Sequence, residues 1–217
     1  MVDWDELAER ARRRFVDGEA RLPEDGDERQ RQLTRMGNAA WAAGLSLLMS
    51  GRRAEAEDWL RRAAETYRRS WPDAPVGSWG RPIGAMKSRL IAGDLEGART
   101  DAKWALDAGA AESESPIGRY AAVLARLVLA DDPAAAALVE SLPAESVIPP
   151  SVTRSLVALA AGDGVAYETA VGELVADFES RDEFLEDLPV ADTVLALQAL
   201  AVERGISVTL KSALLPR

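Results

Sequence analysis

The chain has 217 residues and a formal net charge of −10, and almost half of its residues are apolar. It contains no cysteine and no histidine, which excludes disulfides, thiol nucleophiles, Cys/His zinc sites and the commonest general base. The apolar content is too high for a disordered chain, and the negative charge makes nucleic acid and anionic membrane surfaces unlikely partners.

Apolar runs such as residues 121–130 are far shorter than the roughly 18 residues that a membrane span needs. The first residues are acidic, whereas the start of a secretory signal is basic. We therefore expect no membrane segment and a cytoplasmic location.

Nearly every segment repeats apolar residues at helical spacing and is then interrupted by glycine, proline or aspartate, which predicts an all-α protein. The first helix is predicted from Asp3, which forms a capping box with Glu6, to about Gly18, followed by a loop over residues 22–27. A helix over 28–50 then turns at Gly51 into a second helix over 53–69, with Ala56, Leu60, Ala63 and Tyr67 as its buried stripe.

Three further hairpins follow in chain order. Their first helices are predicted over 82–92, 116–130 and 150–161, and turns are predicted at Gly93 and Asp94 and at Gly162 and Asp163. In the middle hairpin, the return helix is predicted to have Asp132 as its N-cap and Pro133 at its first position. Ser115 is the predicted N-cap of the third hairpin, and Tyr167, Ala170, Leu174 and Phe178 form the buried stripe of the last return helix. A capping box at Ser180 and Glu183, a final helix over 190–204 and an extended apolar tail over 206–216 complete the prediction.

A repeat runs through these hairpins. Pro82, Pro116 and Pro150 are 34 residues apart, a period typical of stacked helical hairpins. Small residues recur at fixed distances from the turns: Gly44, Ala56 and Ala63 around Gly51, and Ala98 and Ala105 after Gly93. On these residues the chain resembles the tetratricopeptide-repeat (TPR) family, best over residues 39–110.

The resemblance implies a right-handed stack of antiparallel hairpins, an α-α superhelix of about ten to eleven helices with an extended C-terminal tail, in one domain over residues 1–217. It also implies a non-catalytic scaffold that binds protein or peptide segments in a groove lined by the first helix of each hairpin.

Charge is divided between the two helices of each hairpin. The first-helix segments 29–50, 82–92, 116–130 and 150–161 carry eight basic residues and no acidic residue. Counted from the proline of each hairpin, Arg119, Arg89 and Arg126 fall at positions 4, 8 and 11, on one helix face, and Arg154 aligns with Arg119 when its hairpin is counted from the turn. Because arginine pairs bidentately with carboxylates, this stripe predicts a groove for a partner of acidic character. The same arginines could instead pair with acidic residues of the second helices and fix the stacking.

The inserted segment 71–82 is the second candidate. Trp79 and Arg81 offer a stacking surface and a cation near the mouth of the expected groove, as at recognition hot spots. Equally, Trp71 and Trp79 could pin an irregular loop to the core. The candidate binding residues are therefore Trp79, Arg81, Arg89, Arg119, Arg126 and Arg154.

No catalytic or metal-binding constellation is predicted, and no cofactor. The acidic residues Asp182, Glu183, Glu186 and Asp187 lack the spacing of a site and fit a solvated short helix. Besides the peptide-binding scaffold, two other classes of function stay open: a small anionic ligand or nucleic-acid sensor, and a self-associating structural or antidote-type module.

Overall fold

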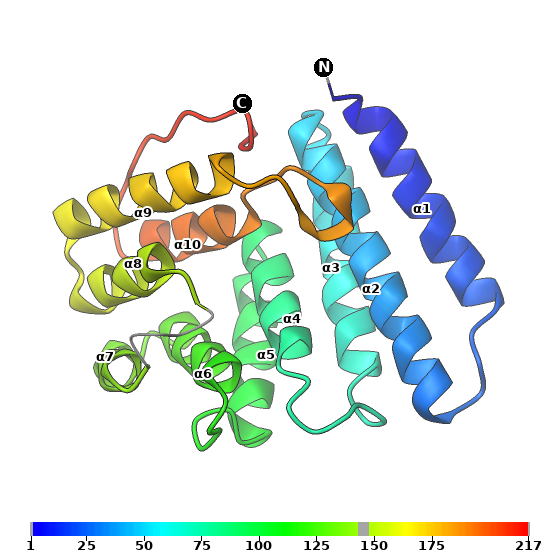
Figure 1. Ribbon diagram of the computed structural model, residues 1–217, viewed down its shortest axis with the longest axis horizontal. Coiled ribbons are helices and arrows are strands. Elements are labelled where there is room, and N and C mark those ends of the chain that lie inside the picture. Colours follow the sequence, from blue (N-terminus) through cyan, green and yellow to red (C-terminus); the bar gives the residue numbers. More distant parts are fainter. Residues whose placement is uncertain (1, 143–147, 217) are drawn as a thin grey trace.

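The computed structural model describes residues 2–142 and 148–216, and this part of the chain is helical without a strand (Figure 1). The α-helices, in chain order, are α1 (Trp4–Ala20), α2 (Gly26–Met49), α3 (Arg53–Arg69), α4 (Gly80–Ile91), α5 (Leu95–Asp107), α6 (Pro116–Val128), α7 (Asp132–Glu140), α8 (Pro150–Ala161), α9 (Gly164–Glu179) and α10 (Asp192–Glu203). One 3₁₀ turn, η1 (Leu185–Asp187), lies between α9 and α10. Over the described ranges, no helix combines the length and the apolar character that crossing a membrane requires.

Most of the predicted elements are confirmed. Helices over 53–69 and 150–161 have the predicted bounds, and the predicted stripes of α3 and α9 are buried. Asp3 caps α1, because its carboxylate accepts a hydrogen bond of 3.0 Å from the backbone N–H of Glu6. The apolar periodicity of the sequence therefore predicted the helical class of the structure correctly.

Several predicted boundaries differ in the structure. Helix α4 begins at Gly80, so Pro82 lies inside its first turn. Helix α7 has Asp131 as its N-cap in place of Asp132. Ser180 ends α9 and does not begin a capping box, and the acidic segment after it forms only the 3₁₀ turn, in which Glu186 and Asp187 have positive φ angles.

Successive helices pack against each other from α1 to α9. In four hairpin turns, a residue within two positions of the end of the first helix has positive φ: Gly51, Gly93, Ala130 and Gly162. At each of these turns a backbone N–H donates to the helix carbonyl five residues earlier at 2.9 Å, for example from Asp94 to Arg89. This is the Schellman arrangement, in which a left-handed residue lets the last carbonyls of the helix be satisfied.

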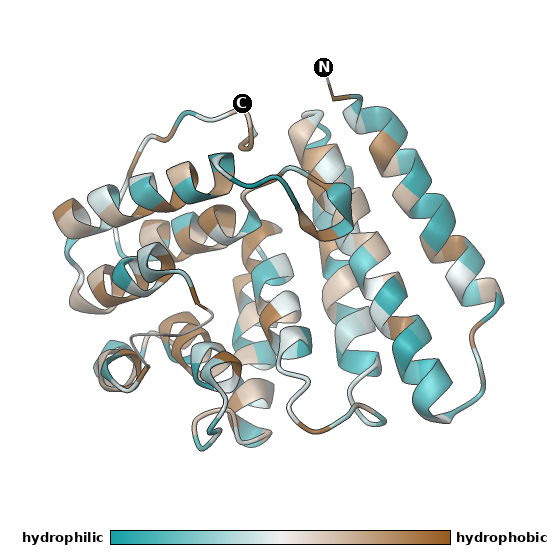
Figure 2. Ribbon diagram, viewed as in Figure 1, coloured by the Kyte–Doolittle hydropathy of each residue, from teal (hydrophilic) through white to brown (hydrophobic). Residues whose placement is uncertain are grey.

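The C-terminal helix α10 does not continue the row of hairpins. It packs mainly across α4 and also contacts α8 and α9, so it lies against the first helices of two hairpins that are not neighbours (Figure 1). The segment that leads to it, residues 180–191, reaches α2 and begins with a hydrophilic stretch (Figure 2). The tail that follows is extended, as predicted, and is tied to α10 by hydrogen bonds from Gln198 to the carbonyl of Val208 and from the N–H of Ala191 to the carbonyl of Leu214.

Candidate functional site

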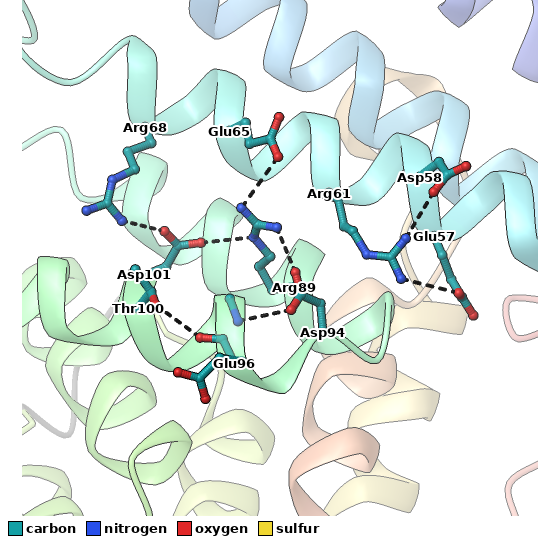
Figure 3. Close-up of polar contacts among 11 residues, drawn as sticks. Glu57, Asp58, Arg61, Glu65, Arg68, Arg89, Asp94, Glu96, Thr100 and Asp101 are labelled. Atoms are coloured by element: carbon teal, nitrogen blue, oxygen red, sulfur yellow. Dashed lines mark hydrogen bonds and ion pairs between the residues drawn. The ribbon is translucent and has the colours of Figure 1, made fainter.

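Arg89 belongs to an ion-pair network between α3, α4 and α5 (Figure 3). Its guanidinium lies 2.6 Å from Asp94 and 3.4 Å from Asp101, and Arg68 holds the other oxygen of Asp101 at 2.9 Å. Burial raises the pKa of Asp94, but the N–H of Gly97 and the guanidinium of Arg89 outweigh burial and hold that pKa below its usual value. Arg89 therefore fixes the stacking of three helices.

Arg126 and Arg154 also pair within their own hairpins. Arg126 lies 2.9 Å from Asp131, and Arg154 lies 2.5 Å from Glu173 of α9. Arg126 and Asp131 repeat the five-residue separation of Arg89 and Asp94, from the last turn of a first helix to the N-cap of the second. For these three arginines the ion-pair interpretation is confirmed.

Arg119 and Trp79 are tied to the protein in other ways. Arg119 donates to the backbone carbonyls of Ser113, at 3.1 Å, and Ser141, at 2.7 Å. Trp79 is only 7% exposed, and its ring lies 5.8 Å from that of Trp71, which contacts Trp104 in turn. The two tryptophans thus pin the inserted segment, as one of the two interpretations expected.

The structure does not bring the six candidate residues together in one groove. Their partners differ from hairpin to hairpin, and α10 covers part of α4 and α8, where the groove was expected. Helix α2 also begins earlier than predicted and includes Asp27 and Glu28, so the first helices are not free of acidic residues.

A pocket of about 440 Å³ lies between α2, α4 and the segment that precedes α10. Helix α2 contributes Thr34, Asn38 and Trp41, which share one helix face. The N-terminal half of α4 forms the opposite wall, and Leu185 and Asp192 close one side. We call this cavity the Arg81 pocket; it is lined by Thr34, Asn38, Trp41, Tyr67, Ser78, Gly80, Arg81, Ile83, Gly84, Lys87, Leu185 and Asp192.

Arg81 differs from the other candidate arginines because it is buried without a counter-charge. It is 8% exposed, and within the described part of the chain it makes no ion pair. Its Nε and Nη2 atoms donate to the hydroxyl of Thr34, at 3.2 and 3.1 Å, and Nη2 also donates to the side-chain carbonyl of Gln30.

The third nitrogen of Arg81, Nη1, is buried and has no hydrogen-bond partner among the described residues. Burial lowers the pKa of Arg81, because the charged form is taken out of water with no carboxylate to offset the cost. A buried cation with an unsatisfied donor is costly, and such groups call for an explanation.

Tyr67 forms the floor of the pocket because two glycines leave room for its ring. A Cβ atom on Gly37 of α2 would lie 2.7 Å from the ring, and one on Gly84 of α4 would lie 2.9 Å from it. Burial, with the charges of Asp192 and Glu186, raises the pKa of Tyr67, so its hydroxyl stays protonated and donates to Asn38 at 2.9 Å.

Two ion pairs hold the segment between α9 and α10 against this floor. Glu186 accepts a hydrogen bond of 3.2 Å from Asn38 and pairs with Arg14 of α1 at 2.5 Å. Lys87 of α4 pairs with Asp192 and donates to Thr193 at 2.9 Å. The positive charge of Lys87 is therefore neutralised within the protein, while that of Arg81 is not.

Of the residues that line this pocket, Arg81 alone was a candidate on the sequence. The sequence does contain a pattern that could have indicated the α2 wall of the pocket. Polar residues share one helix face with a core tryptophan at the positions Gln30, Thr34, Asn38 and Trp41. Leu185 and Asp192 carry no such signal, because only the path of the chain between α9 and α10 brings them to α4.

Among residues 2–142 and 148–216, no three acidic side chains are placed to hold a metal ion, and the acidic residues after α9 do not form such a group. Comparisons of the chain with protein-family models, with curated proteins and with solved structures find no significant match.

Proposed function

We propose that the chain is a non-catalytic binding module, built as a TPR-like array of helical hairpins, that takes an acidic group of a partner protein or peptide into the Arg81 pocket. The observation that carries the proposal is Arg81 itself, a guanidinium that is nine-tenths buried at the wall of a pocket without a carboxylate partner. An acidic ligand in the pocket would supply the missing negative charge.

The surroundings of Arg81 support an anion in this place. Arg81 lies in the first turn of α4, where the partial positive charge of the helix terminus favours negative groups. The volume of the pocket lies within the range of about 300–1,000 Å³ that is usual for ligand sites.

The assignment as a binder rather than an enzyme rests on how the other polar groups are used. Lys87 and Asp192 pair with each other, and Glu186 pairs with Arg14. The hydroxyl of Tyr67 donates a hydrogen bond to Asn38. A general acid or base has to reach a substrate proton, and these groups are held by partners in the fold.

The first test measures binding of an acetylated hexaglutamate peptide by calorimetry. We expect Arg81→Gln to weaken binding by tenfold or more, because a charge-assisted hydrogen bond contributes about 1.5–3 kcal/mol. Affinity of the unaltered protein should fall as the ionic strength rises.

Arg154→Gln is the matched control. Arg154 is an arginine on another first helix, its side chain is 55% exposed, and its partner Glu173 is also partly exposed. We expect this variant to bind the peptide as the unaltered protein does. Equal losses in both variants would show that the peptide responds only to overall charge, and the proposal would then be wrong.

A further inference from the structure

The free donors and the net charge of the Arg81 pocket restrict which acidic group it can accept. From these features we infer that the group bound at Arg81 is a single carboxylate carried on an apolar body, and not a phosphate. This inference rests on the proposed function and narrows the class of ligand at the same site.

Several side-chain donors of the pocket are already used within the protein. The hydroxyl of Thr34 donates to the carbonyl of Gln30 at 2.8 Å, and that of Ser78 donates to the carbonyl of Pro75 at 2.6 Å. The amide of Asn38 is used on both sides, by Tyr67 and Glu186. The Nη1 group of Arg81 therefore stands out as a buried donor without a partner at the described wall of the pocket.

The charges of the pocket sum to one positive charge when Lys87 and Asp192 are paired. With Lys87 neutralised by Asp192, Arg81 leaves the pocket with one uncompensated positive charge. A carboxylate carries one negative charge, whereas a phosphate monoester carries about −1.5 to −2 and brings three acceptor oxygens. A phosphate here would bury excess negative charge, which is costly in a low dielectric.

Part of the pocket wall is apolar. Trp41, Ile83 and Leu185 line the pocket together with the ring of Tyr67. Leu185 is 58% exposed, which makes it one of the few large apolar side chains that face solvent in the described ranges. A ligand with an apolar body would cover Leu185 and the indole of Trp41 while its carboxylate reaches Arg81.

This chemistry has two sources, a free carboxylic acid or an acidic residue beside an apolar residue in a polypeptide. The probes are phenylpropanoate for the free acid and a capped tetrapeptide, acetyl-Gly-Phe-Glu-Gly-amide, for the polypeptide. Three further compounds test the parts of the ligand. Acetate lacks the apolar body, phenyl phosphate carries a phosphate in place of the carboxylate, and phenylpropanamide has a neutral amide in its place. Binding is followed by calorimetry and by the fluorescence of the tryptophans.

We expect phenylpropanoate or the tetrapeptide to bind at least tenfold more tightly than acetate, phenyl phosphate and phenylpropanamide. The tighter of the two identifies the source. Arg81→Gln should abolish this preference, and Leu185→Ala should weaken the apolar probe severalfold while leaving acetate unchanged. Leu185 is largely exposed, so the Leu185→Ala variant should fold normally. It therefore tests the inference even where a change at Arg81 disturbs folding.

The outcomes separate this inference from the proposed function. Tighter binding of phenyl phosphate, or equal binding of phenylpropanamide, overturns the carboxylate assignment. If hexaglutamate binds through Arg81 but an apolar body adds nothing, the inference fails and the proposed function stands. If no anion binds in a way that depends on Arg81, both are wrong.

Discussion

At the scale of single residues, Arg81 and Arg89 show how similar side chains on one helix come to differ. Both are largely buried on α4. Arg89 lies between Asp94 and Asp101, and the latter carboxylate is only 3% exposed, so both signs of charge are matched. Arg81 is held by neutral acceptors, Gln30 and Thr34, and its charge is unmatched. An arginine held in an ion pair and an arginine without a counter-charge should therefore respond differently to removal of the charge.

This difference predicts the stability of two methionine variants. Arg89→Met leaves the buried Asp101 short of a partner, so we expect the free energy of unfolding to fall by about 3 kcal/mol. Arg81→Met removes an uncompensated buried charge but leaves the acceptors of Gln30 and Thr34 unpaired, so we expect a change within about 1 kcal/mol. Urea denaturation followed by circular dichroism measures both.

A loss in Arg81→Met as large as that in Arg89→Met would mean that Arg81 is a structural residue. The binding proposal would then lose the observation that carries it.

At the scale of elements, the four hairpin turns share one backbone arrangement but not one residue. Gly51, Gly93 and Gly162 adopt the left-handed conformation that glycine reaches without strain, whereas the third turn uses Ala130 at φ 58°. Glycine made three of these turns predictable from the sequence. Alanine carries no turn signal, so the predicted first helix of the third hairpin runs through Ala130 and the predicted return helix has Asp132 as its N-cap. The Schellman hydrogen bond from Asp131 to the carbonyl of Arg126 shows that geometry, not residue type, is what repeats.

Exchanging glycine and alanine between two of these turns should shift stability in opposite directions. Gly93→Ala places a Cβ at φ 69°, with no neighbouring atom within 4 Å, so the expected loss of about 1 kcal/mol comes from the backbone alone. Ala130→Gly relieves the same strain at an exposed residue and should stabilise by about 0.5 kcal/mol after the entropy of the unfolded chain is included. Denaturation midpoints report both. A destabilised Ala130→Gly would show that the strain at this turn is smaller than the entropy cost.

The candidate site was harder to predict than the helices for a physical reason. Helical periodicity is written in residues three and four apart, so α3 and α8 could be assigned from the sequence to the residue. The pairing of Arg126 with Asp131 is also short in sequence, and its spacing could have been noticed. The Arg81 pocket joins Thr34, Arg81 and Leu185, which lie far apart in the chain, and no local pattern encodes their meeting.

At the scale of the whole molecule, α10 changes how the array should behave. In a linear repeat array each unit contacts only its neighbours, so the ends can unfold separately. Here α10 packs across α4 and α8, and Arg204 at its C-terminal end donates to the carbonyl of Leu127 at 2.8 Å and pairs with Asp132. At its other end Lys87 fastens α10 to α4. Contacts at both ends of one helix connect the N-terminal and C-terminal halves, so we expect them to unfold together.

The tryptophans allow this to be measured without a label. All six lie within residues 4–104, so their fluorescence reports on the N-terminal half, whereas circular dichroism reports on helices throughout the chain. Leu197 of α10 is fully buried, and Leu197→Ala should lower the free energy of unfolding by about 3 kcal/mol. Because α10 contacts α4, the fluorescence and dichroism transitions should shift together and remain coincident. Val202→Ala, at a residue of the same helix that is 66% exposed, is the control and should change little. An unmoved fluorescence transition beside an earlier dichroism transition would mean that α10 stabilises only the C-terminal hairpins and that the two halves are separate folding units.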